Sequence, residues 1–290
     1  MDPISILLIA MSISLAVGRN ILSKGISGVP FGKRPYFLIQ AATFAVGTVL
    51  IFSLNVDAFV GLATSTVIYA VIYAVLMIAA QWCYLGALGS GVVSICATMY
   101  SMGFIIPTLM GMIAWEEAVT PRKIIGIAIV IPVIILSGMK KNEENERKRK
   151  NSFLIPMVIA LVANGTMGIV QKLLALSAHP EQSPAFVIIA FIIATVVSLA
   201  GALLSGGELP RDFKRKLAFS SGIGICFGSC NLLNTVLTGM VDSSILFPTL
   251  NISIIILSML LGIVLYKEKL GKKQLAILIL GILSILLIAF

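Results

Sequence analysis

The sequence has few charged residues and almost no histidine. Charged side chains make up 11% of its 290 residues, against about 25% in an average soluble domain. Hydrophobic residues make up 59%, so water cannot be the solvent for most of the folded surface. His179 is the single histidine, and all four cysteines lie in apolar runs. The composition excludes a soluble globular domain, and it predicts no metal site and no resident cofactor.

Motifs of membrane-embedded and nucleotide-driven enzymes are also missing. The chain has no His-Glu-x-x-His motif, no pair of aspartates within an apolar run, and no serine or cysteine with a nearby histidine. It has no Gly-x4-Gly-Lys-Ser/Thr loop for binding ATP. We therefore expect no enzymatic activity. An intramembrane enzyme, a channel and a non-catalytic scaffold are the alternatives to the carrier predicted below.

Apolar runs long enough to cross a bilayer, which requires about 20 residues, make up most of the chain. They are predicted at 4–26, 36–54, 64–87, 92–114, 122–139, 152–176, 184–205, 217–239, 243–265 and 272–290. The expected fold class is an all-α integral membrane protein with ten transmembrane helices. Thr120 before Pro121 is typical of an N-cap and first helical residue, and Asp242 is predicted to cap the ninth helix.

The net charge of +9 comes from short basic clusters between the apolar runs, a pattern that indicates membrane orientation and no nucleic-acid partner. Counted from the N-terminus, the odd-numbered loops carry Lys33, Arg34, Lys140, Lys141, Arg147, Lys148, Arg149, Lys150, Arg211, Lys214, Arg215, Lys216, Lys267, Lys269, Lys272 and Lys273. The even-numbered loops carry only Arg122 and Lys123. The positive-inside rule places the odd loops in the cytoplasm and both termini outside. A cell (plasma or inner) membrane is the expected location.

The two halves of the chain repeat each other. Gly111 is followed six residues later by Glu117, and Gly262 is followed in the same way by Glu268, at a shift of 151 residues. The predicted organisation is a first five-helix repeat at 1–139, a charged linker at 140–151, and a second five-helix repeat at 152–290. Because five is odd, the second repeat must enter the membrane in the opposite sense. This predicts an inverted repeat, a common ground plan of secondary transporters.

Ten spans in two five-helix repeats, each with glycine-x5-glutamate closing its fourth helix, resemble the EamA-like branch of the drug/metabolite transporter superfamily. The polar turn after each glutamate and the glycines of the next helices, Gly126 and Gly281, match the family's form. The resemblance implies a carrier of small metabolites or drugs across the lipid bilayer, with no cofactor. Members are often drawn with cytoplasmic termini, the opposite of the orientation that the charges predict here.

Arg19 lies about 15 residues into the first apolar run, where a charge costs at least ~2.5 kcal/mol unless it is paired or reaches the surface. Two interpretations are open. Arg19 extends its side chain to the cytoplasmic surface, or it binds a carboxylate or phosphate of a substrate.

Uncharged polar residues recur on single helix faces, and polar groups in a membrane favour the bundle interior. The candidate substrate-binding residues, besides Arg19, are Asn20, Gln81, Tyr84, Tyr100, Asn164, Gln171, Asn231, Asn234 and Asn251. For each of them, hydrogen bonding between helices is the alternative. Ser220, Gly224 and Gly228 form a small-residue stripe suited to close packing, either within the monomer or between monomers of a homo-oligomer.

The remaining charged residues near the membrane form two pairs of repeat mates. Lys24 and Lys172 are expected on opposite sides of the membrane, either as lysines that extend to the surface or as gate residues. Glu117 and Glu268 lie where helices end beside basic residues, so we interpret them as structural rather than as proton carriers. Taken together, the sequence predicts a secondary transporter of a small solute by alternating access, with export as the expected direction.

Overall fold

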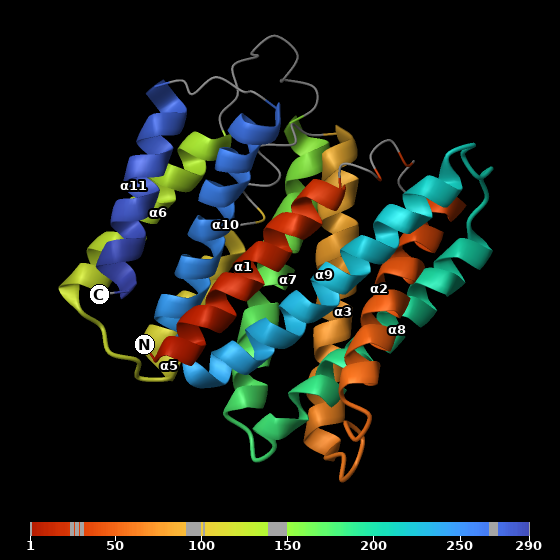
Figure 1. Cartoon of the computed structure of the whole chain (residues 1–290), viewed down its shortest axis with the longest axis horizontal. Helices are drawn as coiled ribbons and strands as arrows, with labels where there is room; N and C mark the ends of the chain where they lie inside the picture. Colours follow the sequence, from red (N-terminus) through yellow and green to blue (C-terminus); the bar gives the residue numbers. More distant parts are fainter. Residues whose placement is uncertain are drawn as a thin grey trace. The chain divides into compact units, whose positions relative to one another are not determined.

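The structure is a computed structural model that describes residues 2–23, 26, 29, 32–90, 100, 102–138, 150–266 and 272–289. These residues form helices and connecting turns, with no strand among them (Figure 1). Six helical segments are long and apolar enough to cross a membrane: Pro3–Ser23, Arg34–Leu54, Thr64–Tyr84, Ile155–Ala175, Pro180–Leu204 and Phe213–Met240. The chain is therefore an all-α, multi-pass membrane protein.

Two compact units divide the chain, and each takes residues from both halves of the sequence. Unit 1 comprises Met1–Ile78 and Val170–Met240, and unit 2 comprises Ala79–Ile169 and Val241–Phe290. The helices α3 (Thr64–Ser90) and α7 (Lys150–Ala175) contribute a part to each unit. These units are defined by compactness, whereas the predicted repeats at 1–139 and 152–290 are defined by likeness of sequence. The repeats stay a prediction.

Unit 1 also contains α1 (Pro3–Ser23), α2 (Arg34–Leu54), α8 (Ser183–Leu204) and α9 (Phe213–Met240). The helix α2 packs lengthwise against α8 (Figure 1) and α9, and α1 packs against α9. Phe37 near the start of α2 meets Gly201 near the end of α8, and Gly47 further along α2 meets Phe191. The two helices therefore run antiparallel.

A small-residue stripe on α9 makes the contact with α2. Ser220 Oγ donates to the Ile39 carbonyl at 2.9 Å. A Cβ atom at Gly224 would overlap the Thr43 carbonyl oxygen, and one at Gly228 would lie 3.0 Å from the Gly47 Cα. The stripe is expected to pack either within the monomer or between monomers, and in the structure it packs against α2 of the same chain. Backbones that approach this closely gain dispersion contacts along the whole interface.

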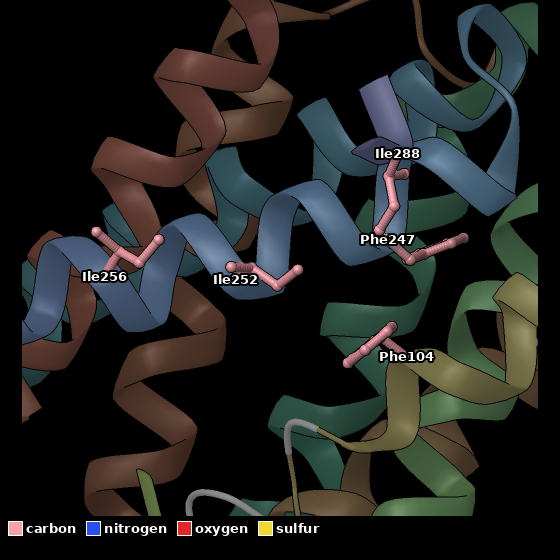
Figure 2. Close-up of a cluster of buried hydrophobic side chains, with 5 residues drawn as sticks. All are labelled: Phe104, Phe247, Ile252, Ile256 and Ile288. Atoms are coloured by element: carbon pink, nitrogen blue, oxygen red, sulfur yellow. The ribbon is translucent and has the colours of Figure 1, made fainter. Parts of the chain in front are cut away.

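Unit 2 contains α5 (Ile105–Ala114), preceded by a 3₁₀ turn at Met102–Phe104, α6 (Pro121–Gly138), α10 (Ser243–Tyr266) and α11 (Lys272–Ala289). Its buried core includes Phe104, Phe247, Ile252, Ile256 and Ile288, and Figure 2 shows Phe247, Ile252 and Ile256 along α10 with Phe104 and Ile288 reaching in from other segments.

The helices α6 and α11 of unit 2 run antiparallel. Ser284 Oγ near the end of α11 donates to the Gly126 carbonyl near the start of α6, at 2.8 Å. A Cβ atom at Gly126 would also lie 2.6 Å from the Ile288 side chain. The N-cap expected before α6 is confirmed, because the backbone N–H of Lys123 donates to Thr120 Oγ1 at 3.3 Å.

Candidate functional site

A buried hydrogen-bond network joins α3, α7 and α9 in unit 1. Tyr73 Oη donates to Asn231 Oδ1, while Gln171 Nε2 donates to Tyr73 Oη at 3.2 Å and to Thr235 Oγ1 at 3.0 Å. Asn231 Nδ2 donates back to the Phe227 carbonyl at 2.8 Å. All four polar side chains are buried. Because each finds partners inside the protein, the network joins three helices as the interhelical alternative predicted.

Arg19 lies in the same unit but outside this network. Its guanidinium carbon stands 4.2 Å from the centroid of the Phe227 ring on α9, a cation–π distance. Arg19 is half-buried, and among the residues that the structure describes no carboxylate pairs with it and none accepts a hydrogen bond from it. Arg19 thus differs from Tyr73, Gln171, Asn231 and Thr235, whose polar groups find partners within the protein.

An aromatic cluster supports the ring beneath Arg19. Phe227 stacks on Phe191 with centroids 5.5 Å apart and an interplanar angle of 23°. Phe44 meets Phe191 edge-on at 5.5 Å, and both rings are buried. The cluster joins α2, α8 and α9, so the ring that faces the guanidinium is fixed by packing from three helices.

Asn234 lies about one turn after Asn231 on α9 and faces α1. Ser12 Oγ donates to Asn234 Oδ1 at 2.6 Å, and Asn234 Nδ2 reaches the Cys230 sulfur at 3.7 Å, a weak contact. Its amide N–H groups thus have less hydrogen bonding than those of Asn231. Asn20, also predicted to line the interior, is exposed on α1.

Unit 2 brings together another part of the predicted set. The Tyr84 and Tyr100 rings lie 4.8 Å apart and pack against buried Met157 and Ala160. Asn164 Nδ2 donates to the Tyr100 carbonyl at 3.2 Å, and Gln81 is buried. Asn164 is therefore engaged with backbone. Of the predicted residues, Tyr84 and Tyr100 supply aromatic surface in this cluster.

Asn251 lies on α10, where its Nδ2 donates to the Phe247 carbonyl one turn back, at 2.9 Å. This bond lies beside Pro248, which is inside α10 and cannot donate a backbone hydrogen bond. Two buried hydroxyls of α10, Ser243 Oγ and Thr249 Oγ1, have no hydrogen-bond partner among the described residues.

Glu117 makes a buried charged contact in unit 2. Its carboxylate accepts hydrogen bonds from the backbone N–H groups of Ser243 at 2.7 Å and Ser244 at 2.8 Å. It thereby caps the start of α10, where unpaired N–H groups favour an anion. Glu117 itself is buried. Its carboxylate occupies the space that a side chain at Gly111 would need, which explains the glycine of the motif.

Lys123, a residue of α6, lies near the start of α10 and is also buried. Its Nζ donates to the Ala118 carbonyl at 2.8 Å and to Ser244 Oγ at 3.2 Å, and it stands 3.7 Å from Asp242 Oδ2. Asp242 therefore pairs with a lysine, while Glu117 supplies the cap predicted for Asp242. Ser243 and Ser244 lie 126 and 127 positions after Glu117. Their hydrogen bonds to Glu117 depend on the tertiary fold, and the sequence pattern could not identify them.

The other predicted gate and motif residues are placed as follows. Lys172 is buried on α7 next to Gln171, and Gly262 lies in the last turns of α10. Lys24 and Glu268 lie outside the described residues. Sequence reasoning missed Thr235, Phe227 and Ser12 as partners of the predicted set. The position of Thr235 one helical turn after Asn231 could have indicated a shared face.

Comparison with known proteins yields a fold but no family. No family model matches the chain, and no curated protein matches it. Among solved structures 28 chains match. One of them, described only as "Crystal structure of protein", superposes with a TM-score of 0.79 at 14% identity, covering 99% of this chain and 96% of its own. The whole chain therefore has a fold already seen in a crystal structure.

Proposed function

We propose that this chain is a secondary transporter of the EamA-like branch of the drug/metabolite transporter superfamily. It moves a small metabolite or drug-like solute by alternating access, and export is the proposed direction. The observation that carries the proposal is the antiparallel packing of helices that hold equivalent positions in the two halves. The helices α2 and α8, second in their halves, pack antiparallel, and so do α6 and α11, fifth in theirs.

The connections between helices support the same arrangement. At one end of unit 1, the backbone N–H of Arg34, after the first helix, donates to the Gly206 carbonyl at 3.1 Å. At the other end of α2, Gln182 Nε2 donates to the Gly61 carbonyl at 2.9 Å. In the inverted-repeat arrangement Gln182 is the counterpart of the loop before Arg34, and Gly61 is the counterpart of the loop at Gly206. Each end thus has a hydrogen bond between the corresponding loops of the two halves, as opposite membrane faces of an inverted repeat require.

An inverted repeat matters for function because its halves can exchange conformations. When one half adopts the conformation of the other, an opening on one side of the membrane closes and an opening on the other side forms. Polar groups at membrane depth, such as Arg19 and Asn234, are expensive in a purely structural bundle. They are expected where a solute passes.

The proposed location is the cell membrane, with both termini outside the cytoplasm. In this orientation the basic residues near Arg34 and around the start of α9 face the cytoplasm. Five of them are exposed: Lys33, Arg34, Arg211, Lys214 and Arg215. Lys216, which is buried, pairs with Asp212 at 3.4 Å.

An untargeted comparison of metabolites in medium and cells tests the proposal. Cells that overexpress the protein are compared with cells carrying the empty vector at matched membrane protein content. Enrichment of a solute in the medium supports an exporter. A solute that rises only inside the cells overturns the export direction, and identical profiles under all growth conditions contradict the transport proposal.

A further inference from the structure

Arg19 lies against the middle of α9, one of the helices long and apolar enough to cross a membrane. Phe227, the ring beneath its guanidinium, lies midway along the 28-residue helix α9. At 1.5 Å of rise per residue, the ring is about 20 Å from either end of that helix. The end of α1 is only four residues beyond Arg19, yet the guanidinium lies against the aromatic ring instead of extending past that end. This geometry disagrees with an arginine that reaches for the surface.

Among the described residues of unit 1, no carboxylate pairs with Arg19. The acidic residues of this unit all lie outside its α-helices: Asp2, Asp57, Glu181, Glu208 and Asp212. The ring of Phe227 stabilises one face of the guanidinium. Its N–H groups have no acceptor among the described residues, although a guanidinium can donate five hydrogen bonds.

We infer that Arg19 binds a carboxylate or phosphate group of the transported solute, an inference that rests on the proposed function. A guanidinium fork matches both anions with two parallel hydrogen bonds. The aromatic cluster of Phe44, Phe191 and Phe227 fixes the face of the guanidinium, which leaves its N–H edges for the ligand.

Thermal unfolding of the purified full chain tests this inference without knowledge of the solute. The protein is placed in nanodiscs of phosphatidylcholine, and its melting temperature is measured with benzoate, phenyl phosphate or the neutral analogue benzamide. We expect at least one anion to raise the melting temperature and benzamide to have no effect. Arg19→Gln should weaken the apparent affinity for that anion at least tenfold, because a charge-assisted hydrogen-bond pair is lost.

Arg215→Gln is the matched control. Arg215 also stands over a phenylalanine ring of α9, Phe219, at 5.7 Å, but it is exposed at the start of the helix. Its replacement should leave the anion effect unchanged. Equal anion binding by wild type and Arg19→Gln, or stabilisation by benzamide to the same extent as benzoate, would overturn the inference.

A second variant and a change of lipid distinguish a solute anion from a folding defect and from a lipid phosphate. If Arg19→Gln does not fold, Arg19→Lys keeps the charge but loses the fork, and it should weaken binding several-fold. The assay is repeated in phosphatidylglycerol nanodiscs with no soluble anion. An Arg19-dependent stabilisation by that lipid alone would assign the position to a lipid phosphate and overturn the solute assignment.

The inference and the proposed function fail in different ways. Exchange of a neutral or cationic solute that does not depend on Arg19 would refute the anion position and leave the transporter proposal standing. Arg19-dependent anion binding without any exchange of that anion across a membrane would support the anion position and refute the transporter proposal.

Discussion

Gly111 and Glu117 are matched in space as well as in sequence. The Glu117 carboxylate occupies the position that a Cβ atom on Gly111 would take, and the backbone N–H of Glu117 donates to the Gly111 carbonyl at 3.1 Å. Between them Glu116 adopts a positive φ of 52°, which reverses the chain after α5. The first glycine-x5-glutamate motif, from Gly111 to Glu117, is thus a helix end folded back so that its acid reaches the start of another helix.

Replacement of Gly111 by alanine should destabilise the protein. The added methyl group must displace the buried carboxylate, and overpacking of this kind costs about 1–3 kcal/mol. Thermal unfolding in detergent measures the loss. Gly239→Ala is the matched control, since its methyl group would meet only the Ala175 side chain at an ordinary 3.4 Å. If Gly111→Ala and Gly239→Ala had the same melting temperature, the steric explanation of the glycine at position 111 would be wrong.

Glu117→Gln should lower stability without altering the pH dependence of transport. The amide has one acceptor oxygen where the carboxylate has two, so one of the N–H groups of Ser243 and Ser244 loses its partner. Such a loss costs about 1–3 kcal/mol. Stability is measured by chemical or thermal unfolding, and transport by a flux assay across pH values. A shifted pH profile would show that Glu117 carries a proton and would refute its role as a cap.

The hydrogen bonds of Tyr73 and Gln171 should be energetically coupled. Tyr73→Phe removes the hydroxyl that donates to Asn231 and accepts from Gln171. Polar contacts between membrane helices are worth roughly 0.6 kcal/mol on average and about 1.7 kcal/mol at most. In a double-mutant cycle with Gln171→Met, the unfolding free energies should depart from additivity by an amount in this range. Strict additivity would mean that the network does not act as a unit.

Single cysteines at Lys33 and Glu181 test the inverted arrangement and its orientation together. Both positions are exposed, and they hold equivalent places before the second helix of each half. In a background without the four native cysteines, a membrane-impermeant maleimide added to intact cells should label Glu181→Cys but not Lys33→Cys. Labelling of Lys33→Cys alone would invert the orientation, and labelling of both would contradict the inverted repeat.

Local features of this fold could be predicted from sequence, whereas partners distant in sequence could not. The Thr120–Pro121 helix start follows from neighbouring residues and is confirmed by the bond to Lys123 N–H. The all-α membrane class follows from composition. The small-residue stripe on α9 predicts close packing, but only the fold identifies α2 as its partner.

In the candidate site, too, the sequence identifies individual residues but not their partners. Arg19 stands out in sequence because a charge within an apolar run is costly. Its side chain has several rotatable bonds, so the sequence does not decide whether it extends to the membrane surface or toward a substrate. The contact with Phe227, 208 positions away, depends on how α1 packs on α9. Helical spacing identifies Gln171 as an interior residue, yet only the structure pairs it with Tyr73 and Thr235.

Counterflow in proteoliposomes tests alternating access most directly. The wild-type protein is reconstituted, the vesicles are loaded with the solute found in the metabolite comparison, and uptake of a labelled trace of the same solute is followed. We predict that loading accelerates labelled uptake and drives its transient accumulation, because a carrier returns faster with solute bound. Uptake that is unsaturable and unaffected by loading would indicate a channel and contradict the carrier mechanism.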